Sequence, residues 1–181
     1  MSINSPIEIS LNFSEYVSQS FFNIRKILKF NEKAQELLMA ASAGRKQAYV
    51  PYSRFAVGAA LRCRDETQTI VAGCNVESCS YPVSICAERT ALTKAVSEGK
   101  RHFSGLGVVA ERVEGRLTSP CGMCRQMVLE FAQDCPVYIS SPELDQVLVT
   151  TTSQLLPHAF APPKSSLVLS ACRSTTDDLQ Q

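Results

Sequence analysis

Apolar residues follow two spacings along this chain, and each spacing predicts a different kind of element. Near the start they recur three or four positions apart, as on one face of an amphipathic helix. The residues of this stripe are Phe13, Tyr16, Val17, Phe21, Ile24 and Leu28. We expect the stripe to pack on the body of the protein or on a partner subunit.

Further along the chain, helical patterns alternate with short apolar runs. The expected helices cover residues 33–48, 86–98 and 121–132. The expected strands cover residues 55–63, 69–76, 106–110, 137–140 and 147–150. Such alternation predicts an α/β fold in which helices cover a sheet. The chain has no internal repeat and no glycine-rich phosphate loop.

These patterns divide the chain into three parts. Residues 1–30 are expected to form an amino-terminal extension of helical character, and residues 31–160 a single folded domain. Residues 161–181 begin with Ala-Pro-Pro, are mostly polar, and are expected to be a flexible tail.

Composition narrows the classes of partner. Of the 181 residues, 45% are hydrophobic and 19% charged, which is typical of a globular protein. The 18 basic residues are balanced by 17 acidic ones, so we expect no nucleic-acid partner held by phosphate contacts. No apolar run reaches the length of about 18 residues that predicts a membrane-spanning helix, so no membrane partner is expected.

The eight cysteines bear on the compartment and on metal binding. An even count could mean disulfides, but the first residues have no secretory pattern and no arginine-rich, acid-poor presequence. We therefore expect reduced thiols in a cytoplasmic protein that could also be present in the nucleus. Some of the thiols are expected to bind a metal ion.

Three cysteines have the spacing of a metal site. Cys86 lies at the expected start of one helix, and Cys121 and Cys124 lie at the start of the next. Free N–H groups and the helix dipole at such positions favour the thiolate that zinc requires. Three protein ligands leave a coordination position open, which is typical of catalytic zinc. Glu88 could lie beside that position, and Arg89 is the nearest cation that could offset the negative charge of the thiolates.

Five blocks of this chain resemble, in order, the zinc-dependent cytidine deaminases of the small, homotetrameric type. The blocks are residues 52–60, 73–77, 86–91, 119–126 and 155–160. Residues 1–30 and most of the tail have no counterpart in that pattern. The resemblance implies a three-layer α/β fold with a central mixed sheet of about five strands and helices on both faces.

The resemblance also implies a reaction. Cys86, Cys121 and Cys124 would hold one Zn²⁺ per subunit, and Glu88 would transfer protons as general base and then acid. The implied activity is hydrolytic deamination of cytidine and 2′-deoxycytidine to uridine and 2′-deoxyuridine, with release of ammonia, in pyrimidine salvage. Arg89 matches an arginine that hydrogen-bonds the ligand sulfurs.

Matched positions further imply the substrate contacts. The Ala87 backbone N–H would face the base, and Phe55 would pack against the base or sugar. Asn75 and Glu77 would hydrogen-bond the ribose hydroxyl groups.

Two aromatic residues, Tyr81 and Phe160, match side chains that a neighbouring subunit contributes. Through them the resemblance implies a homotetramer with active sites shared between subunits.

Several alternatives remain open from the sequence alone. The three cysteines could belong to a closed structural zinc site completed by Cys74 or Cys79. Asn75 and Glu77 could serve turn chemistry, and the aromatic residues could serve packing only. The chain could also be a polynucleotide editor or a non-catalytic zinc-binding scaffold. The sequence does not decide between ribose and deoxyribose, nor the effect of Met123 between two of the cysteines.

Overall fold

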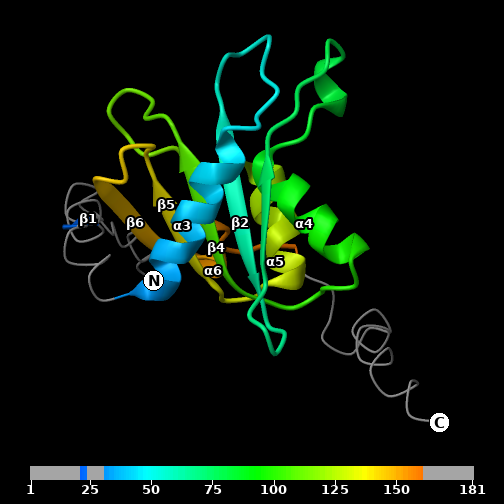
Figure 1. Ribbon diagram of the computed structural model, residues 1–181, viewed down its shortest axis with the longest axis vertical. Helices are drawn as coiled ribbons and strands as arrows, with labels where there is room; N and C mark the ends of the chain where they lie inside the picture. Colours follow the sequence, from blue (N-terminus) through cyan, green and yellow to red (C-terminus); the bar gives the residue numbers. More distant parts are fainter. Residues whose placement is uncertain (1–20, 24–30, 161–181) are drawn as a thin grey trace, which may run out of the picture.

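The computed structural model describes residues 21–23 and 31–160 of the chain (Figure 1). The prediction for the tail, and most of the predicted first helix, therefore lie outside the described residues. In the part of the chain that the structure describes, no helix is long and apolar enough to cross a bilayer.

The described elements alternate as the patterns predict. The helical elements are α3 (Glu32–Arg45), η1 (Tyr81–Val83), α4 (Ala87–Ser97), α5 (Gly122–Phe131) and α6 (Thr152–Leu155). The strands are β1 (Phe21–Asn23), β2 (Val57–Cys63), β3 (Ile70–Cys74), β4 (Phe103–Ala110), β5 (Pro136–Ser140) and β6 (Gln146–Thr151). They form one sheet in the order β1-β6-β5-β4-β2-β3. Only the β4–β5 pair is parallel, so the predicted mixed sheet is confirmed.

Helices cover both faces of this sheet, which confirms the three-layer prediction. Figure 1 shows α3 on one face and α4 and α5 on the other. Alternation along the strands supplies a core to each face. On β2, Ala59 and Leu61 pack under α4 and α5, whereas Ala60 packs under α3.

The first strand corrects the helix expected at the start of the chain. The structure places Phe21–Asn23 in β1, antiparallel to β6, with Phe22 opposite Val147. The rest of the expected helix, in residues 1–20 and 24–30, lies outside the described residues. A free sheet edge offers unpaired N–H and C=O groups to any extended segment. This pairing partner is more than 100 residues away and cannot be read from local periodicity.

Two glycines set how closely the helices approach the sheet. A Cβ on Gly58 would lie 1.9 Å from the Ala41 carbonyl oxygen of α3. A Cβ on Gly73 would lie 2.5 Å from the Ala91 nitrogen of α4. The absence of a side chain at Gly58 therefore lets α3 lie directly on the sheet, and its absence at Gly73 does the same for α4, which begins beside Cys86.

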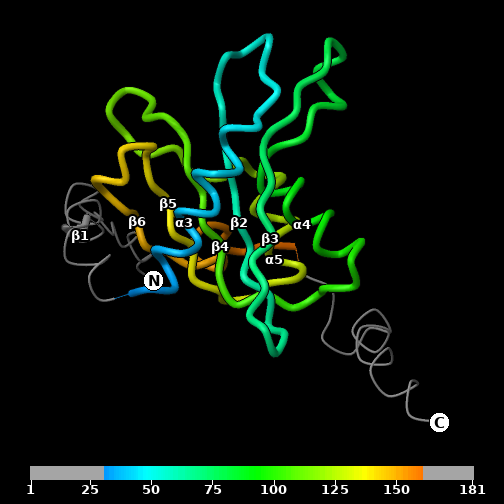
Figure 2. The backbone as a smooth tube through the Cα atoms, viewed as in Figure 1, coloured from blue at the N-terminus to red at the C-terminus, as the bar shows by residue number. Residues whose placement is uncertain are grey.

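Two loops project from one end of the molecule. Figure 2 shows residues 46–56 and 75–86 side by side beyond the ends of the strands. A backbone bridge between Tyr49 and Val76 joins the loops, and the rings of Tyr52 and Tyr81 meet edge to face with centroids 5.8 Å apart.

Candidate metal centre and active site

The predicted cysteines meet where two helices begin. Cys86 is the N-cap residue of α4 and Cys121 is the N-cap residue of α5, both with extended backbone. Neither side chain caps its own helix, so both sulfurs are available to other groups. Cys124 follows one turn into α5 and is fully buried.

The sulfur positions fit a zinc ion. The Sγ atoms of Cys86 and Cys121 are 3.8 Å apart, and those of Cys121 and Cys124 are 3.5 Å apart. All three Sγ atoms lie within 4.8 Å of one another. Tetrahedral zinc with bonds of about 2.3 Å requires sulfur atoms about 3.8 Å apart. The donors present thus match zinc in both chemistry and spacing.

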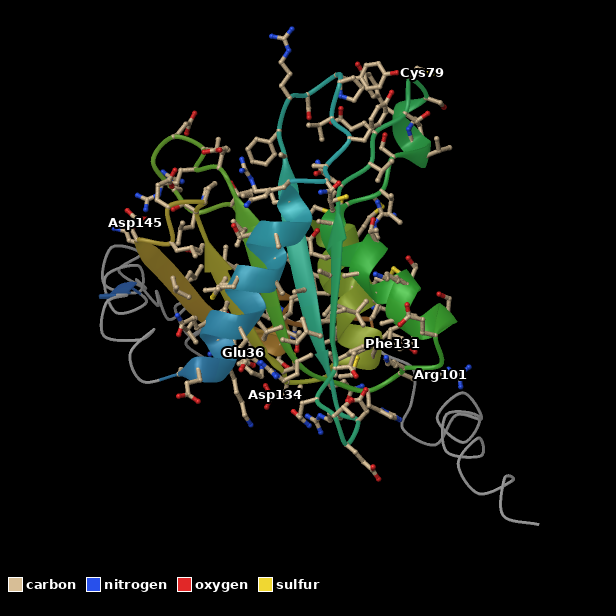
Figure 3. The ribbon with its side chains drawn as sticks, in the orientation of Figure 1. Glu36, Cys79, Arg101, Phe131, Asp134 and Asp145 are labelled. Atoms are coloured by element: carbon tan, nitrogen blue, oxygen red, sulfur yellow. The ribbon has the colours of Figure 1, made fainter. Side chains whose placement is uncertain are left out.

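The group contains three ligands, not four, within the described residues. Cys74 directs its thiol to the Gln47 carbonyl oxygen at 3.3 Å. Cys79 is exposed on the loop beside η1, as Figure 3 shows. The closed four-cysteine site considered from the sequence therefore has no support from either residue.

The pKa values of two of the thiols are shifted in opposite directions. Hydrogen bonding from Cys124, together with the Arg89 guanidinium, lowers the pKa of Cys86 to about 5 despite partial burial. The same contact with Cys86, together with burial, raises the pKa of Cys124 far above its usual value. One thiolate is thus already favoured, and a bound cation would displace the remaining protons.

Glu88 is an acidic side chain buried beside these sulfurs. It lies in the first turn of α4 and is only 3% exposed. Burial raises the pKa of its carboxyl group, and the negative charge of Cys86 raises it further. A buried carboxyl with a raised pKa, adjacent to a metal-ligand set, is suited to accept and return a proton.

Arg89 supplies positive charge at the edge of the sulfur group. Its Nη2 donates to the Cys86 Sγ at 3.8 Å and to the Ser84 carbonyl oxygen at 3.3 Å. Three thiolates around one divalent ion carry a net charge of −1, so this cation offsets part of that charge.

The predicted sugar-binding pair is already engaged with the backbone. The Asn75 Oδ1 accepts from the Val57 N–H at 2.8 Å, and its Nδ2 donates to the Phe55 carbonyl oxygen at 2.8 Å. The Glu77 Oε2 accepts from the N–H groups of Tyr52 and Ser53. The turn chemistry weighed for this pair is therefore present. Each group keeps lone pairs or a donor for a ligand, so the sugar contact stays a prediction.

The other predicted substrate contacts differ in exposure. Ala87 is fully buried at the first position of α4, where backbone N–H groups lack partners within the helix. Phe55 is half-buried. Tyr81 is 71% exposed, with its ring edge to face with that of Tyr52, and Phe160 is 83% exposed.

Comparison with known proteins shows which family has a sequence similar to that of this chain. Residues 31–140 match the family described as cytidine and deoxycytidylate deaminase zinc-binding region. The chain belongs to this family. It is 48% identical over 128 residues to a cytidine deaminase of Sporosarcina psychrophila, which covers 70% of this chain and 90% of the relative. It is 46% identical over 127 residues to that of Halalkalibacterium halodurans, covering 70% and 92% of the two chains.

Solved structures of the deaminase family share the fold. The crystal structure of cytidine deaminase from Burkholderia pseudomallei has a TM-score of 0.64 and 42% sequence identity, covering 70% of this chain and 98% of that one. That from Mycobacterium tuberculosis has a TM-score of 0.59 and 35% identity, covering 72% and 98%. A blasticidin-S deaminase of Bacillus cereus is 34% identical over 136 residues, covering 71% and 94%.

Two polar residues next to the cysteine group were not singled out by the sequence reasoning. Arg125 and Gln126 directly follow Cys124 and reach the chain segment that ends at Phe160. They stand in one of the five matching blocks, and their position next to a ligand was the available signal. Their partners, about 30 residues away, could not be read from the sequence.

Proposed function

We propose that this chain is a zinc-dependent cytidine deaminase that converts cytidine and 2′-deoxycytidine, with water, to uridine and 2′-deoxyuridine and ammonia. The observation that supports this reaction most directly is the buried Glu88 beside three sulfur atoms whose separations fit a zinc ion. The relatives named cytidine deaminase, at 46–48% identity, support the same reaction. A nucleoside salvage role follows from a free pyrimidine nucleoside as substrate.

Cys86, Cys121 and Cys124 are the residues that would hold the zinc ion. When bound, zinc acts as a Lewis acid and makes water a nucleophile at neutral pH. Arg89 offsets excess negative charge at Cys86, which keeps the thiolates from weakening that effect.

Glu88 carries the proton transfers in this proposal. Its carboxylate accepts a proton from the attacking water and delivers it to N3 of the pyrimidine. The same carboxyl group then takes the proton of the new C4 hydroxyl group and passes it to the amino group, which leaves as ammonia while the C4 carbonyl forms. Burial keeps the carboxyl out of bulk water, so the proton is held for the substrate. Zinc deaminases as a class use a glutamate that is not a zinc ligand in this way.

The base and sugar contacts come from neighbouring segments. The Ala87 N–H at the start of α4 is directed to the base, and Phe55 packs against base or sugar. Asn75 and Glu77 bind the sugar hydroxyls with the hydrogen-bonding capacity that their backbone contacts leave free. Hydrogen bonds with the Ser53 side chain, and then with the N–H groups of Ser53 and Tyr52, keep the pKa of Glu77 low, so it meets the sugar as a carboxylate acceptor.

The active sites are completed in a homotetramer in this proposal. Tyr81 and Phe160, at 71% and 83% exposed, would each enter the site of a neighbouring subunit. The seven described cysteines are all free, which fits a reducing compartment such as the cytoplasm.

A turnover assay on the full chain tests this function. Zinc-loaded protein is expected to deaminate cytidine and 2′-deoxycytidine, followed by loss of cytidine absorbance and by stoichiometric ammonia. A single-stranded oligonucleotide containing cytosine is expected to remain unchanged under the same conditions. Zinc-loaded, folded protein that turns over neither nucleoside would overturn the proposal. Turnover of the oligonucleotide alone would instead favour a polynucleotide editor.

A further inference from the structure

Arg125 joins two segments that lie far apart in the sequence. Its Nε donates to the Pro120 carbonyl oxygen at 2.7 Å, and its Nη2 donates to the Ser119 Oγ at 2.7 Å. Its Nη1 donates to the Leu155 carbonyl oxygen at 3.0 Å. All three nitrogen atoms of one planar group are thus used, and none of these acceptors is a carboxylate.

At the zinc end, this guanidinium fixes the approach to Cys121. Ser119 and Pro120 immediately precede that ligand, whose side chain makes no capping bond to α5. The Arg125 backbone N–H also donates to the Cys121 carbonyl oxygen at 3.0 Å. The Arg125 side chain therefore ties the two residues that lead into the exposed Cys121 to the helix turn that carries the buried Cys124.

At the other end, Arg125 fixes the short helix α6 and the segment after it. The Gln126 Nε2 adds a second tie, to the Phe160 carbonyl oxygen at 2.7 Å. The opposite end of α6 is anchored by Thr152, which is 3% exposed. The Thr152 Oγ1 donates to the Ala132 carbonyl oxygen at 2.8 Å and accepts from the Cys135 N–H at 3.1 Å.

The contacts of Arg125 and Thr152, which together we call the clamp, thus join α6 to both ends of α5. Thr152 holds α6 to the end of α5, and Arg125 holds Leu155 to its first turn. Leu155 and Cys124 also line one small apolar pocket with Val128. A lysine could not replace the clamp, because an ammonium on a flexible stem lacks the planar fork that meets three acceptors at once.

We propose that Arg125 is a positioning residue that couples the zinc-ligand loop 119–121 to the carboxyl-terminal segment 155–160. Zinc binding and order in segment 155–160 then stabilise each other, because a coupling between two sites acts equally in both directions. The proposal rests on the zinc site of the proposed function. It gives Phe160 a fixed position relative to the metal ligands of its own chain.

Zinc release is the first test. Full-length Arg125→Met is expected to lose zinc to a chromogenic chelator about tenfold faster than the wild type, since residues that orient metal ligands typically change affinity by about 10- to 100-fold. Arg116→Met is the matched control. Arg116 is exposed, and its hydrogen bonds with Val113 run through the backbone, so the substitution keeps them. Equal release from Arg125→Met and wild type would overturn the proposal. Arg125→Lys, expected to fall between them, serves if Arg125→Met does not fold.

Hydrogen–deuterium exchange tests the coupling itself. In the wild type, removal of zinc is expected to speed exchange in residues 155–160 and leave residues 57–63 of β2 unchanged. In Arg125→Met, residues 155–160 are expected to exchange fast with or without zinc. The coupling would be contradicted if removal of zinc left the exchange rate of residues 155–160 unchanged in the wild type. It would also be contradicted if removal of zinc changed that rate equally in the wild type and in Arg125→Met. Wild-type protein that binds no zinc would instead count against the proposed function.

Discussion

The two ends of the candidate active site are built differently. At the zinc end, the ligands and Glu88 stand on the first turns of α4 and α5, with Cys124 and Glu88 buried. At the sugar end, Glu77 and Tyr81 come from the projecting loop 75–86, and Tyr81 is 71% exposed. One end is complete within a single chain, and the other is open to a ligand or a second chain.

This contrast separates the chemistry from the recognition of substrate. Groups fixed on helix starts keep their geometry without substrate, as proton transfer and metal binding require. Groups on loops depend on hydrogen bonds to neighbouring backbone, as Glu77 does. Changes at the zinc end are therefore expected to act on kcat, and changes at the sugar end on KM, stability or assembly.

The largest effect is expected from Glu88→Gln. Glutamine keeps the size of the side chain but cannot accept and return the proton, so kcat is expected to fall by about 10²- to 10⁴-fold. Zinc content, measured by mass spectrometry of metals, is expected to stay at one per chain. Near-normal turnover in this variant would remove Glu88 from its assigned role.

A smaller effect is expected from Arg89→Met. Loss of the cation beside Cys86 leaves the thiolate charge uncompensated, so zinc affinity and kcat are each expected to fall by about tenfold or more. Competition with a chelator and steady-state kinetics measure the two quantities. Lys94→Met is the matched control, because Lys94 is exposed near the end of the same helix. Indistinguishable results for Arg89→Met and its control would contradict the charge argument.

At the sugar end, Asn75→Ala is expected to lower stability as well as affinity. It removes the hydrogen bonds to Val57 and Phe55, at a cost of about 1–3 kcal/mol in the free energy of unfolding. Asn75→Asp keeps the acceptor and is expected to lose less. Denaturant unfolding gives the stability, and cytidine kinetics give KM. A rise in KM with unchanged stability would show that the backbone contacts contribute little.

Phe160→Ala is expected to raise KM by several-fold, because an aromatic contact contributes about 1 kcal/mol beyond its buried area. If Phe160 acts in a neighbouring site, mixed oligomers with Glu88→Gln recover activity. The Glu88→Gln chain then supplies the missing ring to sites that keep an intact Glu88. Activity of the mixture equal to the sum of the two separate variants would contradict a shared site.

The smallest effect concerns pH and Glu77. Hydrogen bonds with Ser53 and Tyr52 lower the pKa of Glu77 below its ordinary value of 4.5. A lowered pKa contributes stability that is present above the unfolded pKa and lost as pH falls through the folded pKa. The stability difference between wild type and Glu77→Gln is therefore expected to be constant above pH 4.5 and to shrink below it. Denaturant unfolding curves at pH values from 3 to 7 measure this difference in the free energy of unfolding. A difference that grows as the pH falls would contradict the lowered pKa of Glu77.

Local signals in the sequence, together with the family resemblance, predicted the zinc end. The helix starts near Cys86 and Cys121 follow from periodicity and from Pro120, and the structure brings Cys86, Cys121 and Cys124 together. The strands of the central domain were predicted within a few residues, because alternation and turn residues are local. The mixed sheet with helices on both faces followed from the family resemblance.

Contacts between distant segments were beyond the sequence. The pairing of Phe21–Asn23 with β6 turned part of an expected helix into a strand. The backbone bonds of Asn75 and the clamp formed by Arg125 join segments 18 to 30 residues apart. No spacing rule encodes such partners, since they arise only when the sheet and its helices pack.

X-ray absorption at the zinc edge of the purified, full-length protein tests the central claim most directly. The account predicts one zinc per chain with three sulfur atoms at about 2.3 Å and one lighter oxygen or nitrogen atom at about 2.0 Å. Four sulfur atoms around the zinc, or protein that retains no zinc, would contradict an open three-cysteine site.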